Sequence, residues 1–214
     1  MLKLDNISRR HFLTAAGTIG LAAVASPAIG PGAISRYIAT PKPPEIVSGA
    51  VAAAKAALER LGNRVGHRDV VAVADFSRPS SEPRLHLIDM VSGRVDRLLV
   101  AHGRGSDPTH TGWLRRFSNT PGSDCTSEGA YLTGDYYVGE HGRSMRVVGL
   151  DPTNNNAEAR AIVVHPAWYA SPQVVRVHGM LGRSDGCFAV SQTDVSAVLG
   201  RLGPGHLLLA TRLT

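Results

Sequence analysis

The sequence predicts a mainly β domain with a few short helices, preceded by one helix that lies outside the core. Short runs rich in β-branched and aromatic residues recur from residue 70 onward, and Gly, Pro, Asn and Asp separate them. Apolar residues at helical spacing occupy residues 46–61. The chain has 214 residues, of which 43% are hydrophobic, and this suits one domain with accessory segments.

Residues 1–28 are predicted to be an export signal that is cleaved. Residues 8–13 (SRRHFL) match a twin-arginine signature, and the apolar stretch after them is shorter than the roughly 20 residues of a membrane span. Small residues offer cleavage sites after Ala25 or Ala28. The alternative is that Arg9 and Arg10 are the ordinary basic residues of a signal for the general secretory route. Both routes predict a periplasmic or extracellular protein. No cysteine follows the apolar stretch, so no stable membrane anchor is expected after cleavage.

Residues 29–45 are rich in Pro and Gly and are predicted to be a linker. Residues 46–61 (IVSGAVAAAKAALERL) predict a helix that ends at Gly62, within an N-terminal helical segment over residues 46–66. The main domain is then expected over residues 67–214.

The main domain is predicted to consist largely of strands. Residues 91–93 (VSG) are typical of a turn and make the second and third strands a hairpin. Residues 191–194 (SQTD) match a helix cap ahead of a short helix over about 193–201. The expected strands are Val70–Phe76, Arg84–Met90, Arg94–Ala101, Tyr131–Val138, Met145–Leu150, Ala161–His165, Gln173–Val177 and His206–Thr211.

The formal charge of +6 and the pI of about 9.8 favour an anionic partner such as a wall polymer, or simply a solvated basic surface. Nucleic acid is not the expected partner, because the arginines are scattered and aromatic residues make up only 5% of the chain. Few of the 23 basic residues are lysines, and none of these lies beyond Lys55. This excludes a serine–lysine dyad or a Schiff-base lysine in the main domain.

Residues 182–186 (GRSDG) match the G-x-S-x-G motif of serine hydrolases. That fold needs a long helix after the serine, followed by the acid and the histidine of the triad. In the short remainder of the chain, Asp194 belongs to the predicted helix cap and His206 begins the last strand. The serine interpretation of Ser184 therefore does not fit the rest of the sequence.

The chain has two cysteines, Cys125 and Cys187, and a disulfide between them is one expectation for an exported protein. The alternative is that Cys187 is a nucleophile, with its own N–H and that of Gly186 holding a developing oxyanion. A free thiol has a pKa of about 8.5 and needs a base or a positive field beside it. His165 and His178 each end a β-rich run, and their spacing does not choose between them. Cys125 is then a bystander or a regulatory partner.

Several motifs, read in order, carry a resemblance to a known family. They are VADFS, LLVAHGRGS, FSNTPGS, LTGDYYVGEHGRSMRVVGL, AIVVH and LGRSDGCFAV, between about Ala72 and Arg212. In this order the segment resembles the L,D-transpeptidase catalytic domain of secreted bacterial murein enzymes. The resemblance implies a β-sandwich or barrel in which the strand histidine, His165, is the base and Cys187 is the nucleophile.

The same resemblance makes Ser184, Asp185 and Gly186 the oxyanion and loop support of the cysteine, in the family's Ser-x-Gly-Cys pattern. The sequence departs from the family pattern at two positions. Pro166 replaces the glycine that usually follows the strand histidine, and Asp185 replaces a histidine that is frequent before Gly-Cys. A carboxylate there raises the pKa of the thiol unless an arginine such as Arg183 offsets it.

The resemblance implies acyl transfer on peptidoglycan stem peptides, with no cofactor and no metal. Cys187 attacks the carbonyl of the third residue of a stem tetrapeptide, and the terminal D-alanine leaves with a proton from the imidazolium. The amine of a second stem then resolves the thioester into a 3→3 cross-link. If water attacks the thioester in place of this amine, the enzyme is an L,D-carboxypeptidase. Protein partners are not predicted.

Four more residues are expected near the substrate: His141, Arg146, Arg183 and His178. Arg146 and Arg183 would bind carboxylates of the stem in bidentate fashion.

Two other classes of function remain as alternatives. One is a zinc wall peptidase, although neither H-E-x-x-H nor H-x-x-E-H is present. The other is a wall-binding module whose catalytic site has decayed, which Pro166 and Asp185 favour and the retained His165 and Cys187 oppose. The histidines considered for zinc are His102, His110, His141, His165 and His178.

Overall fold

The computed structural model describes residues 45–213. The predicted signal segment and nearly all of the predicted linker lie outside the described residues. Within residues 45–213, no helix combines the length and the apolar character that a membrane crossing requires. The helices are α1 (Glu45–Leu61), α2 (Pro172–His178) and α3 (Val195–Arg201), with short 3-10 turns at Gly62–Arg64, Arg104–Ser106 and Trp168–Ala170.

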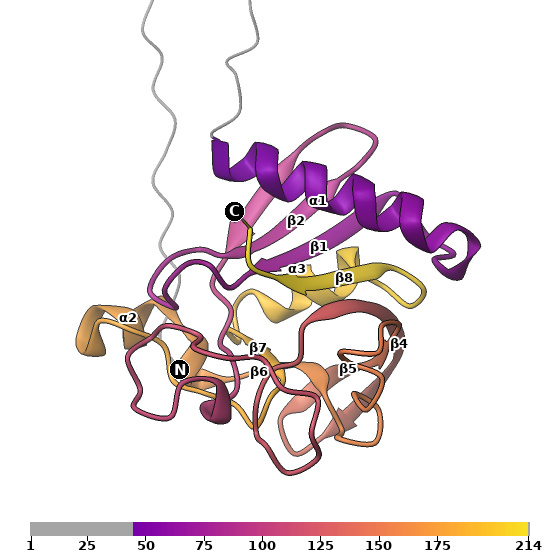
Figure 1. Ribbon diagram of the computed structural model, residues 1–214. Coiled ribbons are helices and arrows are strands. Elements are labelled where there is room, and N and C mark those ends of the chain that lie inside the picture. Colours follow the sequence, from indigo (N-terminus) through magenta and orange to yellow (C-terminus); the bar gives the residue numbers. More distant parts are fainter. Residues whose placement is uncertain (1–44, 214) are drawn as a thin grey trace, which may run out of the picture. The chain divides into compact units, whose positions relative to one another are not determined.

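Eight strands form one sheet in the order β3-β2-β1-β8-β4-β5-β6-β7 (Figure 1). Two neighbouring pairs, β1–β8 and β6–β7, run parallel, and the other pairs run antiparallel. The strands are β1 (Val70–Asp75), β2 (Leu85–Asp89), β3 (Val95–Leu98), β4 (Gly129–Gly139), β5 (Gly142–Gly149), β6 (Val163–Pro166), β7 (Phe188–Val190) and β8 (Leu207–Thr211).

The two edges of the sheet meet. After β3 the chain leaves β2, and Ala101 forms an antiparallel bridge to Ala189 of β7, where the Ala101 N–H donates to the Ala189 carbonyl at 2.8 Å. The sheet thus nearly closes on itself, and the predicted sandwich-or-barrel class is confirmed. Because the chain leaves β2 to reach β7, β3 ends at Leu98 and not at Ala101 as predicted.

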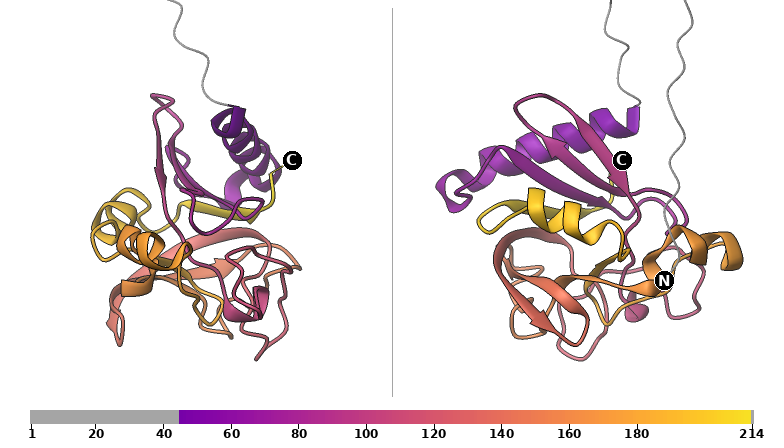
Figure 2. Two further views of the ribbon diagram at one scale, coloured as in Figure 1. Left: turned by 90° about the vertical axis from the view of Figure 1, so that its left-hand side faces the viewer. Right: turned by 180° about the vertical axis from the view of Figure 1, so that it is seen from behind.

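Apolar side chains form separate layers on the two faces of the sheet. Along β1, Ala72 faces the inner cluster that α3 also joins, whereas Val71 faces α1, because side chains alternate between the faces of a strand. Figures 1 and 2 show α1 lying across β1 and β2 on the side opposite α3. On α1, Leu58 and Leu61 are buried, and each buried leucine stabilises the fold by about 1.5–3 kcal/mol. The prediction of a helix outside the core is confirmed.

One predicted strand is wrong, since residues 173–177 belong to α2. Ser171 caps the helix by accepting from the Val174 N–H at 3.4 Å, and Pro172 stands in the first turn. Gly179 ends the helix with a φ of 75°. The valines of this run favour a strand, but the capping residues on both sides decide the conformation.

β7 is not among the expected strands. Its three residues are too few to show an alternating pattern, and its partner β6 lies earlier in the chain across a helix and a loop. Its place in the sheet depends on tertiary pairing alone.

Candidate active site

The pairing of strands β6 and β7 brings the backbone of His165 near that of Cys187. The strands are parallel, with Val164 opposite Phe188 and His165 opposite Ala189. Val164 and Phe188 point into the core, so His165 points to the other face of the sheet, and Cys187 directly precedes β7. Because Cys187 precedes Ala189 by two residues, its backbone lies diagonal to that of His165 in this pairing.

His165 is a buried imidazole with a defined orientation. It is 2% exposed, and its Nδ1 lies 2.9 Å from the Pro166 carbonyl oxygen. Because a carbonyl only accepts, Nδ1 carries the proton and Nε2 of the neutral ring is the free base. Burial is the main cause that lowers the pKa of His165 below 6.5, and the charge of His141 lowers it further, while the Pro166 carbonyl and Asp185 act in the opposite direction. The ring is therefore neutral at pH 7.

Cys187 is a half-buried free thiol. It donates to the Ala161 carbonyl oxygen at 3.7 Å. Burial is the main cause that raises the pKa of the thiol, and Asp185 raises it further, whereas a backbone hydrogen bond from Val163 and the charge of Arg160 lower it. The resting pair is a neutral thiol beside a neutral imidazole, so proton transfer has to accompany attack by sulfur.

The hydroxyl of Ser184 is committed within its loop. The Ser184 N–H donates to the His102 carbonyl at 3.0 Å, and the Ser184 carbonyl accepts from the Arg104 N–H at 2.7 Å. The side chain is buried, donates to the Cys187 carbonyl at 2.7 Å and accepts from the Gly186 N–H at 3.3 Å. These bonds hold the loop against the segment that closes the sheet.

Gly186 occupies a position that has no room for a side chain. Its φ is +114°, a conformation that L residues rarely adopt. A Cβ on this residue would lie 2.7 Å from the Cys125 carbonyl oxygen and 2.8 Å from Cδ1 of Ile162. Cys125 itself is fully buried, and both cysteines are free, so the disulfide alternative is absent from this structure.

Asp185 is paired with Arg104, so the arginine that offsets its charge in this structure is Arg104 rather than Arg183. Nε of Arg104 lies 3.2 Å from Oδ1 of Asp185, and the same guanidinium holds Asp124 at 2.9 Å. Arg183 instead donates to the Pro108 carbonyl at 3.2 Å. The segment around Arg104 pairs with the loop of Asp185, and this pairing decides which arginine neutralises the carboxylate.

The structure separates the other predicted substrate residues. His141 stacks on His165, with the ring centroids 4.3 Å apart. Arg146 stands opposite Val163 in the β5–β6 pairing, so it shares the face of His165. His178 is the last residue of α2 and lines a small hollow of about 170 Å³, so the structure does not place it on this sheet face.

Other surfaces lie apart from these residues. Residues 45–213 hold no group of three or more His, Cys, Asp or Glu side chains placed to share a metal ion.

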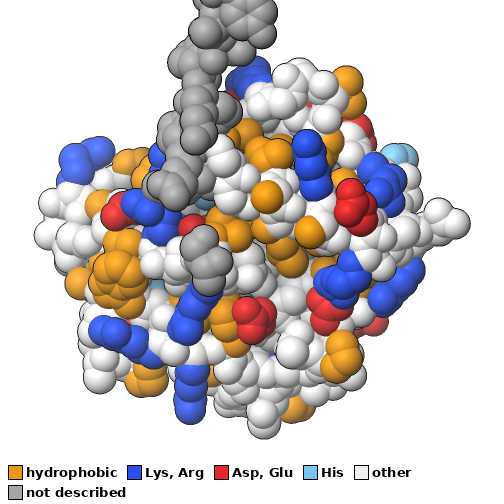
Figure 3. All heavy atoms as spheres, turned by 45° about the horizontal axis from the view of Figure 1, so that its top comes forward, with side chains coloured by type: hydrophobic (Ala, Val, Ile, Leu, Met, Phe, Trp, Pro, Cys, Tyr) orange, Lys and Arg blue, Asp and Glu red, His pale blue; other side chains and the backbone are white. Residues whose placement is uncertain are grey.

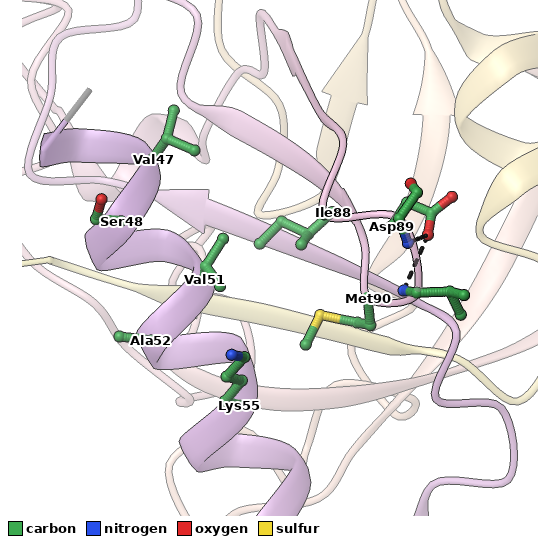
Figure 4. A pocket seen from close by; sticks show the side chains of 11 residues that line it. Val47, Ser48, Val51, Ala52, Lys55, Ile88, Asp89 and Met90 are labelled. Atoms are coloured by element: carbon green, nitrogen blue, oxygen red, sulfur yellow. Dashed lines mark hydrogen bonds between the residues drawn. The ribbon is translucent and has the colours of Figure 1, made fainter. Parts of the chain in front are cut away.

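A hollow of about 570 Å³ lies between α1 and the turn after β2, where Val51 faces Ile88 and Met90 (Figure 4). On the face shown in Figure 3, basic side chains are interspersed with acidic and apolar ones.

A family model described as the L,D-transpeptidase catalytic domain matches residues 44–210. The chain belongs to this family.

Solved structures similar to this L,D-transpeptidase domain carry the same family name. They include an L,D-transpeptidase from Mycobacterium smegmatis, 15% identical, over 66% of this chain and 58% of that one, with a TM-score of 0.39. L,D-transpeptidase 3 from Mycobacterium tuberculosis, in complex with a faropenem-derived adduct, is 14% identical over 67% and 60%, with a TM-score of 0.42. The chain spans about three fifths of the length of these structures. No curated protein sequence is a significant match. The assignment rests on the family match.

In this L,D-transpeptidase domain, Pro166 extends β6 by one residue beyond His165. Pro166 pairs with Val190 of β7, and the next residue, Ala167, donates to the Val190 carbonyl at 2.8 Å. Proline lacks an N–H, so the strand continues with one donor fewer and then turns into the 3-10 turn at Trp168–Ala170. Because Pro166, which replaces the glycine of the family pattern, is still part of β6, His165 is not the last residue of the strand.

Two residues of this L,D-transpeptidase domain were missed by sequence reasoning. Arg104 neutralises Asp185, and Arg160 places a second guanidinium near Gly186. No local pattern marks either arginine, because each reaches the site from a loop that is far from Cys187 in sequence.

Proposed function

We propose that the chain is a cysteine-dependent acyl transferase that acts on peptidoglycan stem peptides, with Cys187 as nucleophile and His165 as base. The observation that supports this proposal is the β6–β7 register, in which Cys187 lies two residues before Ala189, the partner of His165. Family membership supports the reaction class. The unprotonated Nε2 that follows from the Pro166 contact supports the role of the base.

Acylation proceeds in balanced steps. Nε2 of His165 takes the thiol proton as Sγ of Cys187 attacks the carbonyl of the third stem residue, and a C–S bond forms. Backbone N–H groups at Gly186 and Cys187 hold the oxyanion, in competition with the long contact from Gly186 to Ser184. The C–N bond to the terminal D-alanine then breaks, and His165 returns the proton to the leaving amine.

The acceptor decides the product. When the side-chain amine of a second stem attacks the thioester, a 3→3 cross-link forms and Cys187 regains its proton. When water attacks, the product is a tripeptide stem, and the enzyme acts as an L,D-carboxypeptidase. Incubation with a purified tetrapeptide stem, followed by mass analysis of dimers and tripeptides, distinguishes these two outcomes.

The experiment that tests the proposal is intact-mass analysis of the protein after incubation with a carbapenem. We expect one adduct on the wild type and on Ser184→Ala, and none on Cys187→Ala. An adduct that is lost in Ser184→Ala but kept in Cys187→Ala would establish a serine nucleophile instead. A reduced, metal-free wild type without any adduct would favour the decayed wall-binding module. Elemental analysis of the purified protein tests the zinc alternative.

Export is proposed from the sequence of the first 28 residues. A reporter fused to residues 1–30 is expected to leave the cytoplasm, and conversion of Arg9 and Arg10 to lysine is expected to stop it. Continued export of the double variant would exclude the twin-arginine route and favour the general secretory route.

A further inference from the structure

Arg160 lies against the backbone that carries the thiol. A Cβ added at Gly186 would be 3.2 Å from Nη2 of Arg160, which places the guanidinium beside the residue that precedes Cys187. Ala161, the residue after Arg160, is also the acceptor of the Cys187 thiol at 3.7 Å. The backbone of this short segment therefore contacts the sulfur, and its arginine side chain lies beside the residue before Cys187.

Neutral acceptors hold the guanidinium in place. Nη1 donates to the Ser118 carbonyl at 2.9 Å and to Oγ of Ser127 at 3.4 Å, and Nη2 donates to the Cys125 carbonyl. Within residues 45–213, Arg160 forms no ion pair with a carboxylate. Its positive charge is fixed in position but is not neutralised by these oxygens, unlike that of Arg104.

The backbone next to Arg160 is strained. Ala161 has a φ of 52°, a left-handed conformation that non-glycine residues rarely adopt. The strain turns the chain into β6 and directs the Ala161 carbonyl to the thiol of Cys187. Strain of this kind is often retained where the geometry serves a site.

We propose that Arg160 is an electrostatic partner of Cys187, whose fixed guanidinium stabilises the negative charge that forms on sulfur and on the acyl oxyanion. This role rests on Cys187 being the nucleophile of the proposed function. Because the guanidinium is only partly exposed, water screens it less than a surface charge. Its charge lowers the pKa of the thiol, in opposition to burial.

Other charged or titratable groups also face the thiol. Asp185 opposes thiolate formation, but its carboxylate is shared with Arg104. Tyr131 and Tyr169 are neutral at pH 7, since the pKa of each is raised to about 12 mainly by burial. Arg160 is thus the unpaired positive group of this set, which comprises Asp185, Arg160, His165, Tyr131 and Tyr169.

The test is the pH dependence of Cys187 alkylation by iodoacetamide, followed by peptide mapping to separate Cys187 from Cys125. Sulfur forms a bond to carbon, iodide leaves and the thiol proton goes to solvent, so the rate follows the thiolate. Arg160→Gln is expected to raise the midpoint by about one pH unit, which slows alkylation at pH 7 up to about tenfold. Arg160→Lys, which keeps the charge, is expected to stay closer to the wild type.

Arg212→Gln is the matched control. Arg212 also donates to carbonyl oxygens, those of Leu114 and Arg115 at 2.8 Å, but it lies at the end of β8. Its loss is expected to leave the alkylation midpoint unchanged. If the midpoint for Arg160→Gln equals that of the wild type while the Tm is lowered, Arg160 stabilises the fold but does not act on the thiol.

A second measurement uses the wild type alone, in case Arg160→Gln does not fold. A fixed positive charge beside sulfur accelerates anionic iodoacetate relative to neutral iodoacetamide. The ratio of the two rates at Cys187 is expected to be higher in the folded protein than in urea, and an equal or lower ratio would overturn the proposal. Neither measurement uses peptidoglycan, so a failed carbapenem reaction and a failed role of Arg160 give different results.

Discussion

The imidazole of His141 stacks on that of His165, with the ring planes inclined by 27°. His141 comes from the turn between β4 and β5, and His165 comes from β6, so the contact joins this turn to the strand that pairs with β5. His141 is exposed and His165 is buried. Burial is the main cause that lowers the pKa of His165, and the charge of His141 lowers it further.

Replacing the outer ring is expected to shift the acid limb of the reaction. His141→Phe keeps an aromatic ring over His165 but removes the charge, so the pKa of His165 rises toward 6.5. Since the base acts when neutral, the acid limb of carbapenem acylation moves to higher pH. The measurement is the acylation rate from pH 4.5 to 8. A limb that stays in place or moves to lower pH would contradict this electrostatic coupling.

Removing the carboxylate before Gly186 is expected to make the thiol more acidic. Burial is the main cause that raises the pKa of Cys187, and Asp185 raises it further, so Asp185→Asn lowers the midpoint of alkylation, only slightly because the carboxylate is exposed. Asp124→Asn is the control, since it removes the other carboxylate that Arg104 holds. The control is expected to leave the midpoint in place, and equal shifts in both variants would mean that Arg104 is responsible.

Gly186→Ala is expected to destabilise the fold and abolish acylation. The new Cβ would collide with the Cys125 carbonyl and with Ile162, in a backbone conformation with positive φ. Together these costs amount to about 2–4 kcal/mol in the free energy of unfolding, measured by urea denaturation. Gly200→Ala is the matched control, because nothing lies within 4 Å of its Cβ and it sits within helix α3. That variant is expected to gain about 0.5–1 kcal/mol.

His86 is expected to make the protein sensitive to acid. Its side chain is fully buried, and both ring nitrogens lack a hydrogen-bond partner among the described residues. Burial is the main cause that lowers its pKa from 6.5 to about 4, so the folded protein binds this proton less readily than the unfolded chain. The contribution of neutral His86 to the free energy of unfolding is complete above pH 6.5 and is lost as the pH falls toward 4.

His86→Leu therefore removes part of this acid sensitivity. The variant is expected to lose about 2 kcal/mol less than the wild type between pH 7.5 and pH 5, as measured by urea unfolding at both values. Buried His102, whose pKa is lowered to about 3 mainly by burial, and His165 contribute in the same direction. A variant with the pH dependence of the wild type would show that His86 is protonated in the folded state or is already neutral when unfolded.

Much of the fold follows from local patterns. The run of β-branched residues on β1 and the helical spacing on α1 are local patterns, and both elements form where they were predicted. The error at α2 arose because the valines were given more weight than Ser171, Pro172 and Gly179, which cap the helix. β7 is too short to be predicted from its own three residues.

By itself, the sequence determined the chemical groups and their order: a strand that carries His165, a glycine loop that carries Cys187, and a family pattern that joins them. Tertiary structure decided that Arg104 rather than Arg183 pairs with Asp185, that His141 covers His165, and that Arg160 lies against Gly186. The physical reason is that strand patterns reflect burial over a few neighbouring residues. Contacts between distant loops depend on how the sheet closes, and no local spacing encodes that closure.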